Sequence, residues 1–238
     1  MPQNEPTQRT NLLLLPGLLC DATVWAAQHE QLSDVATTWA PDYRWADSLE
    51  AMAHAALDIV PGPIAVAGHS MGARVALEVW RAAPDRVTQL ALLDFGVGPV
   101  AEGEAQSRRT LTDLSAGSGT SALVDTWLVP MVHPDRHDEP GLMEPLSDMV
   151  RTYTPDEHAG QISALLKRRD LRPLLPSITV PTLVAVGKQD PWRSIEHHQE
   201  IATAIPGARL AIIDDSGHMT PAEQPGTVTA LLRSWLEW

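Results

Sequence analysis

Short apolar runs alternate along the chain with longer segments in which apolar residues recur at helical spacing. The runs cover residues 11–15, 35–39, 63–67, 87–93, 180–187 and 208–213. Strands that are covered by helices on both faces are apolar along their whole length, as these runs are. Strands that alternate with helices in this way are typical of a parallel, doubly wound sheet, so the pattern predicts an α/β protein.

Residues 96–175 break this alternation, because they contain no clear strand. Helical patterns take the place of strands there, over residues 104–114, 121–128, 141–153 and 155–168. We therefore predict a core formed by residues 1–95 and 176–238, with 96–175 inserted as a helical lid over one edge of the sheet. Most apolar residues of the lid are expected to pack on the core, and a few to line a pocket.

Composition and charge narrow the class of protein. The chain has 238 residues and a net charge of −13, which makes nucleic acid and anionic membrane surfaces unsuitable partners. The single cysteine, Cys20, allows no internal disulfide and fits a reducing compartment. The longest apolar run, Leu12 to Cys20, is interrupted by Pro16-Gly17 and is too short to span a bilayer. We expect a cytoplasmic protein that is a monomer or a homodimer.

The sequence Gly68-His69-Ser70-Met71-Gly72 joins one of the apolar runs to a helical segment that begins at Ala73. A strand that turns at once into a helix forces the central serine into a strained backbone conformation, and its neighbours two residues away must be very small. Such a turn exposes the serine hydroxyl above the sheet edge. It also directs the first free N–H groups of the helix to the place where an oxyanion would develop. Strand, Gly-x-Ser-x-Gly and helix together indicate a nucleophilic serine at Ser70.

A nucleophilic serine needs a base, and the base needs an orienting acid. Ser70, Asp190 and His218 occur in the chain order expected of a Gly-x-Ser-x-Gly hydrolase. Each follows a predicted strand, so all three should meet at one edge of a parallel sheet. Asp94 also ends a predicted strand and is the second candidate for the acid. The alternative for Asp94 is a structural carboxylate that accepts loop N–H groups.

The other histidines do not indicate a metal site. His133 and His137 are four residues apart, but a proline lies between them and no glutamate completes a zinc motif. His197 and His198 are adjacent in a predicted helix, so they do not share a face. We therefore predict neither a metal nor a cofactor. Cys20, near the first loop, is expected to be a small buried side chain rather than a reactive thiol.

The chain resembles the α/β-hydrolase family over nearly all of the predicted core. The likeness is carried by LLLLPG at 12–17, GHSMG at 68–72, PTLVAVGKQD at 181–190, GHM at 217–219 and EQP at 223–225. The chain starts at what the family counts as its third strand, so the resemblance implies a minimal sheet of six strands. It also implies an oxyanion hole formed by the N–H groups of Met71 and Leu18, with Leu19 as the alternative to Leu18. Where the family usually has His-Gly in the first loop this chain has Pro16-Gly17, which removes a side-chain hydrogen bond that braces the loop.

Together, the site residues and the resemblance predict a serine hydrolase that cleaves a carboxylic ester of a small or medium substrate through an acyl-enzyme. The alternative is a hydrolase of an enol-lactone or a homoserine lactone. The same site opens a cyclic ester, and Arg169-Asp170-Leu171-Arg172 resembles a segment of lactone-hydrolysing relatives. A carbon–carbon bond hydrolase or a lyase would use the same three residues, and the fold alone does not separate these reactions. A non-catalytic ligand-binding relative would not need all three positions filled.

Overall fold

A parallel sheet of six strands forms the centre of the structure, a computed structural model that describes residues 9–238. The strands are β1 Thr10–Leu15, β2 Ala36–Trp39, β3 Ile64–His69, β4 Val87–Leu93, β5 Thr182–Gly187 and β6 Arg209–Ile213. They lie in the order β2-β1-β3-β4-β5-β6, and every neighbouring pair is parallel. The predicted six-stranded, doubly wound α/β sheet is therefore confirmed.

The strand order reverses at β1. The chain passes from β1 outward to β2 and then returns to the other side of β1 to form β3. In open α/β sheets, ligands bind at the carboxyl ends of the strands on either side of such a reversal. The loop that follows β1 and the turn that follows β3 both lie at this position.

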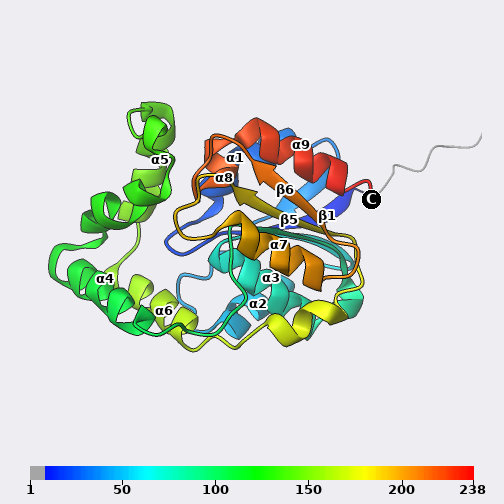
Figure 1. Cartoon of the computed structure of the whole chain (residues 1–238), viewed down its shortest axis with the longest axis horizontal. Helices are drawn as coiled ribbons and strands as arrows, with labels where there is room; N and C mark the ends of the chain where they lie inside the picture. Colours follow the sequence, from blue (N-terminus) through cyan, green and yellow to red (C-terminus); the bar gives the residue numbers. More distant parts are fainter. Residues whose placement is uncertain (1–8) are drawn as a thin grey trace, which may run out of the picture.

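Helices cover both faces of the sheet (Figure 1). On one face lie α1 Ala26–Gln31, α8 Thr220–Glu223 and α9 Pro225–Trp235. On the other lie α2 Leu49–Asp58, α3 Met71–Ala82 and α7 Ile195–Ala204. Ser48 caps α2, because its hydroxyl accepts a hydrogen bond from the N–H of Ala51. No helix among the described residues is long and apolar enough to cross a membrane.

The chain from residue 220 onward forms two helices, α8 and α9, rather than one continuous helix. Pro225 has no N–H to continue the first of them, and Gln224 leaves the helical region with φ −124° and ψ 59°. The result is the short α8, a break, and then α9. The break matters for the site, because α8 carries Thr220 and Glu223 to the carboxyl edge of the sheet.

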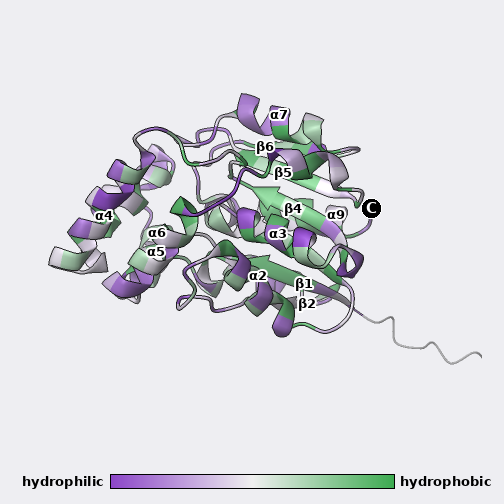
Figure 2. Ribbon diagram, turned by 90° about the horizontal axis from the view of Figure 1, so that it is seen from below, coloured by the Kyte–Doolittle hydropathy of each residue, from purple (hydrophilic) through white to green (hydrophobic). Residues whose placement is uncertain are grey.

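Residues 96–175 contain no strand and lie beyond the carboxyl edge of the sheet, on the side toward which β5 and β6 point (Figure 1). They form α4 Glu104–Ser118, α5 Pro140–Arg151 and α6 Pro155–Leu166, with short 3-10 turns and a π-helical turn at Val124–Leu128. Figure 2 shows that α4 and α5 carry many hydrophilic residues, whereas the strands are hydrophobic. The apolar residues Leu142, Leu146 and Val150 of α5 are nonetheless buried, as are Ile162 and Leu165 of α6.

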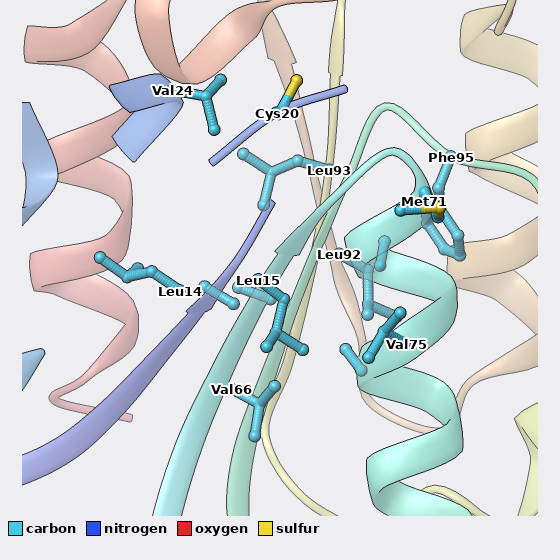
Figure 3. Packing of buried hydrophobic residues seen from close by; sticks show 14 of the residues in the cluster. Leu14, Leu15, Cys20, Val24, Val66, Met71, Val75, Leu92, Leu93 and Phe95 are labelled. Carbon is cyan, nitrogen blue, oxygen red and sulfur yellow. The ribbon is translucent and has the colours of Figure 1, made fainter. Parts of the chain in front are cut away.

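The apolar core lies on both faces of the sheet, and one part of it packs α3 against β3 and β4. All residues of β3 are buried, as expected of a strand with a helix layer on each face. Figure 3 shows Val75 of α3 beside Leu92 of β4, and Met71 at the start of α3 beside Phe95. These contacts fix the start of α3 against the sheet. The backbone at the serine is thus held by buried apolar packing on both sides of the turn.

Three buried histidines are held in their neutral form. Burial lowers the pKa of His69 to about 3 and those of His158 and His198 to about 4. In His198, Nδ1–H donates to the carbonyl of Ser194 at 3.0 Å and Nε2 accepts from the N–H of Phe95 at 3.1 Å. A second proton on this ring would face the N–H of Phe95. Protonation therefore opposes the folded structure.

We expect the free energy of unfolding to fall as the pH is lowered from about 6.5 toward about 4. The folded-state pKa values lie below the unfolded value, so this stabilisation is complete above the unfolded pKa and is lost as acid protonates the unfolded chain first. Each such histidine contributes at most about 1.4 kcal/mol per pH unit. Urea unfolding between about pH 7 and about pH 5 measures the slope. His158→Gln removes a buried histidine and should make the dependence of the unfolding free energy on pH less steep. His54→Gln removes an exposed histidine and should leave that dependence unchanged. Equal slopes in the two variants would show that His158 does not contribute to the pH dependence.

Candidate active site

The turn between β3 and α3 holds Ser70 in a strained conformation. Its φ is 56° and its ψ is −114°, a backbone conformation that residues other than glycine rarely adopt. A Cβ atom at Gly68 would lie 2.3 Å from the carbonyl oxygen of Gly72, and one at Gly72 would lie 2.1 Å from that of Leu15. Only glycine fits at either position, which is the steric requirement that the sequence motif indicates. The turn lifts the Ser70 hydroxyl above the sheet edge.

A continuous line of hydrogen bonds joins Ser70, His218 and Asp190. His218 Nε2 lies 2.8 Å from Ser70 Oγ, and His218 Nδ1 lies 2.7 Å from Asp190 Oδ2. The histidine comes from the loop after β6 and the aspartate from the loop after β5. The structure therefore brings together the three residues that the sequence places after separate strands, in the arrangement of nucleophile, base and orienting acid.

The carboxylate of Asp190 is fixed from both sides. Its Oδ1 accepts hydrogen bonds from the N–H groups of Trp192 at 2.8 Å and Arg193 at 3.0 Å. Burial acts to raise the pKa of Asp190, but the charge and hydrogen bond of His218, together with these two N–H groups, outweigh burial and lower that pKa. Asp190 is therefore ionised at neutral pH. An ionised carboxylate at Nδ1 favours the tautomer in which Nε2 is free to accept a proton.

Asp94, the second candidate for the acid, has other partners. Its Oδ1 accepts from the N–H of Gly187 at 2.9 Å, and its Oδ2 is hydrogen-bonded to the hydroxyl of Thr220. It makes no hydrogen bond to His218. Burial, followed by the charge of Asp190, raises the pKa of Asp94 well above its usual value. The Asp94 carboxyl thus ties the ends of β4 and β5 to α8, which is the structural role that the sequence left open.

The loop that carries His218 is held by a buried carboxylate that sequence reasoning assigned no role. Glu223 of α8 accepts hydrogen bonds from the N–H groups of Gly217 at 3.0 Å, Met219 at 2.9 Å and His133 at 2.8 Å. The N–H of His218 itself donates to the carbonyl of Met131 at 2.7 Å. Met131 and His133 belong to the helical segment 96–175. This segment therefore holds the backbone of His218 in place as well as covering the sheet edge.

We expect Glu223→Gln to lower both the melting temperature and kcat/KM. An amide has one acceptor oxygen where Glu223 uses two, so at least one of the three N–H donors would face an NH₂ group. An unsatisfied buried donor costs about 1–3 kcal/mol. Thermal unfolding and kcat/KM on a common ester measure the two effects, with the same substitution at an exposed position of α7, Glu200→Gln, as control. An unchanged kcat/KM would show that Glu223 does not position the base.

The two N–H groups predicted for the oxyanion hole come from the residue after Ser70 and from the loop after β1. Met71 is the first residue of α3, so its N–H has no acceptor within the helix. One small cavity is lined by all of Leu18, Met71, Ser70 and His218. The N–H of Leu19 donates to Gln161 Oε1 at 2.8 Å, so Leu19 is not available to a ligand. The geometry therefore favours Leu18 over Leu19.

Contacts from elsewhere in the chain brace the loop after β1. Pro16 stands in this loop at the position where the resembled family usually has a histidine. The carbonyl of Pro16 accepts a hydrogen bond from the Tyr43 hydroxyl, and the fully buried Gln161 of α6 holds Leu19. Leu19 has a φ of 53°, a strained value that this hydrogen bond helps to maintain. No local pattern in the sequence indicated either partner, because both are remote from the loop along the chain.

The cavity beside Ser70 has a volume of about 40 Å³ and walls of two kinds. One wall is aromatic: the Trp192 ring lies 5.5 Å from that of His218 and 6.5 Å from that of Trp127. The other wall is cationic, and it consists of Arg74, Arg108, Arg168 and Arg193. Sequence reasoning found none of these four arginines, since they come from separate elements and share no spacing.

Cys20 is buried, as predicted, with an exposed fraction of 2%. Burial, together with the charge of Asp21, raises the pKa of its thiol well above the usual range, which favours an unreactive side chain. Its Sγ lies 3.3 Å from the carbonyl oxygen of Leu18. Within residues 9–238, no group of three or more His, Cys, Asp or Glu side chains is placed to hold a metal ion.

Known proteins resemble this chain in both sequence and structure. A pimeloyl-[acyl-carrier protein] methyl ester esterase from Methylococcus capsulatus is 28% identical over 184 residues, which are 72% of this chain and 70% of that protein. A 3-oxoadipate enol-lactonase from Acinetobacter baylyi is 29% identical over 127 residues, which are 52% of this chain and 46% of that protein. A thermophilic esterase from Thermogutta terrifontis superposes with a TM-score of 0.87 at 29% identity, over 96% of this chain and 89% of that one.

The sequence model of the alpha/beta hydrolase family matches residues 12–231. That range contains all of the sheet except the first two residues of β1, and it includes the serine turn and the loops that carry Asp190 and His218. The chain therefore belongs to the alpha/beta hydrolase family.

Proposed function

We propose that this protein is a serine hydrolase that cleaves a carboxylic ester of a small or medium substrate. The observation that carries the proposal is the hydrogen-bonded line from Ser70 Oγ through His218 to Asp190, at the mouth of a cavity lined by Leu18 and Met71. The similar esterases described above support the same reaction class. In this proposal residues 96–175 act as a cap, and the protein works in the cytoplasm, where its single cysteine would stay reduced.

The reaction would proceed in two halves. Ser70 Oγ attacks the ester carbonyl while His218 Nε2 takes the hydroxyl proton, and Asp190 stabilises the imidazolium that forms. The oxyanion is held by the N–H groups of Met71 and Leu18. His218 then gives its proton to the departing alcohol, which leaves an acyl group on Ser70. In the second half, water attacks the acyl-enzyme with His218 as base, and the acid product is released.

Lactone hydrolysis is the second candidate function. A lactone is a cyclic ester, so the same attack opens the ring and the alcohol stays attached to the acyl chain. The similarity to an enol-lactonase favours this candidate specifically. Carbon–carbon bond cleavage would need a group that stabilises a carbanion, and no observation favours it. A purely ligand-binding role does not account for the strained Ser70 and the complete hydrogen-bonded line.

A fluorophosphonate probe combined with a substrate panel tests the proposal. The probe should label Ser70 and no other serine, as peptide mass spectrometry can show. The panel contains methyl and p-nitrophenyl esters of increasing acyl length beside enol-lactones and homoserine lactones. Turnover of open-chain esters supports ester hydrolysis, and turnover confined to the lactones supports the second candidate. Absence of labelling in the folded protein would overturn both.

A further inference from the structure

The cationic wall of the cavity holds more positive charge than its carboxylates neutralise. Arg108 and Arg168 share Glu104, with Arg108 Nε at 2.8 Å and Arg168 Nη1 at 2.7 Å from Glu104 Oε1. Burial acts to raise the pKa of Glu104, but Arg168 and Arg108 overcome burial and lower that pKa to about 2, so Glu104 is charged. One carboxylate therefore serves two arginines, and the other two arginines of the wall are left over.

Arg74 is one of the two arginines without a carboxylate. It lies on α3 with an exposed fraction of 4%, and its Nη2 donates to the carbonyl of Gly98 at 3.1 Å. Its Nη1 is buried and has no hydrogen-bond partner among the described residues. Burial, and then the charges of Arg168 and Arg193, lower the pKa of Arg74 to about 9, so it stays protonated at neutral pH. A buried donor left unpaired costs free energy unless a ligand satisfies it.

Arg193 is the other arginine without a partner. Its guanidinium lies against Gly96, where a Cβ atom would be 3.1 Å from Cζ. Within residues 9–238 neither Arg193 nor Arg74 forms an ion pair. Asp94 also lines the cavity, but its two oxygens are committed to Gly187 and Thr220, and Asp190 is committed to His218. The cavity thus has an excess of positive charge in a protein whose net charge is −13.

We propose that the substrate carries a carboxylate, a few carbon atoms from the scissile ester, and that Arg74 and Arg193 bind it. The inference deepens the proposed function and rests on it for the role of Ser70. Guanidinium groups match a carboxylate in geometry and charge, and such hydrogen bonds are stronger than those between neutral groups. A bound carboxylate would satisfy Nη1 of Arg74 and reduce the repulsion between the arginines.

The position of Arg74 sets the spacing between the carboxylate and the ester. Arg74 follows Ser70 by four residues, which is about 6 Å along the helix axis. Side chains on a helix lean toward its N-terminus, so the guanidinium returns toward Ser70. The cavity of about 40 Å³ has room for about three water molecules. A half-ester of a short dicarboxylic acid fits this spacing, with its carboxylate beside Arg74 in the cavity and its ester carbonyl at Ser70.

A pair of matched substrates tests the inference. Monomethyl glutarate carries the carboxylate, and the methyl ester of glutaramic acid has a neutral amide of the same shape in its place. We expect the protein to prefer the carboxylate ester. The ratio of the two kcat/KM values should fall by about 10- to 100-fold in Arg74→Gln and in Arg193→Gln, because each loses a charge-assisted hydrogen bond. Arg109→Gln is the control, since Arg109 is exposed and lies outside the cavity, and the substitution removes the same charge.

Binding without turnover separates this inference from the proposed function. In the Ser70→Ala protein, glutarate should raise the melting temperature and glutaramide should not. Adding Arg193→Gln to Ser70→Ala should abolish the rise caused by glutarate. This second variant keeps the test decisive if Arg74→Gln does not fold. A protein that cleaves neutral and anionic esters equally well, with a ratio unaffected by Arg193→Gln, would overturn the anion site and leave the hydrolase intact. If the protein cleaved no ester but bound glutarate through these arginines, the anion site would stand and the hydrolase proposal would be overturned.

Discussion

Ser70→Ala is expected to fold normally and to lose nearly all turnover, about 10⁴-fold or more in kcat. The hydroxyl is the only group at the end of the hydrogen-bonded line, at 2.8 Å from His218 Nε2, and nothing else in that position can form an acyl-enzyme. The residues of such a site act as a unit, so removing the nucleophile costs nearly as much as removing all three. Alanine at this position keeps the Cβ atom and the strained turn. The melting temperature should therefore change little.

The measurement is kcat on the best ester of the panel, with folding monitored by circular dichroism. Ser216→Ala is a matched control, because Ser216 is also buried near His218 and its hydroxyl has no hydrogen-bond partner among the described residues. It should keep its turnover. If folded Ser70→Ala retained more than about one per cent of the activity, another nucleophile would have to be sought.

Asp190→Asn should lower kcat by about 10⁴-fold at a nearly unchanged melting temperature. An amide at this position presents its NH₂ group or its oxygen to His218 Nδ1 without a charge, so the imidazolium loses its stabilisation. If the NH₂ group faces Nδ1, the ring adopts the tautomer in which Nε2 carries the proton and does not accept one from Ser70. By analogy with serine proteases the loss is about four orders of magnitude.

Asp94 provides the matched comparison. Asp94→Asn should keep turnover within about threefold, because its oxygen can still accept from Gly187 and its NH₂ group can donate to Thr220. Asp94→Ala should lower the free energy of unfolding by about 1–3 kcal/mol, since the buried N–H of Gly187 is left unpaired. Urea unfolding and kcat on both variants measure these effects. A 10⁴-fold loss in Asp94→Asn, with activity kept in Asp190→Asn, would transfer the orienting role to Asp94.

The sequence was most informative where the cause of a structural feature is local. Gly68 and Gly72 are required by close backbone contacts within a few residues of Ser70 and with the neighbouring strand, so the motif and its strand–helix context predict the turn directly. The apolar runs predict the strands because each strand is covered on both faces. The break between α8 and α9 also has a local cause, because Pro225 has no N–H with which to continue α8.

Packing decided the questions that the sequence left open between neighbouring or equivalent residues. Asp94 and Asp190 each follow a strand, and only the folded loops show that Trp192 and Arg193 turn the carboxylate of Asp190 toward His218. Leu18 and Leu19 are adjacent, and Gln161 of a distant helix distinguishes them. In both cases the deciding hydrogen bond has a geometry that residue type and spacing do not specify.

The sequence by itself therefore determined the α/β class, the parallel sheet and the edge at which Ser70, Asp190 and His218 collect. Those features follow from apolar periodicity, from the steric needs of one turn and from the common direction of parallel strands. The tertiary structure alone decided what surrounds that edge. Glu223 gathers three N–H groups there, and four arginines come together from α3, α4 and the loops after α6 and β5. Residues so far apart along the chain have no common period, so their charges add up only when the fold places them around one cavity.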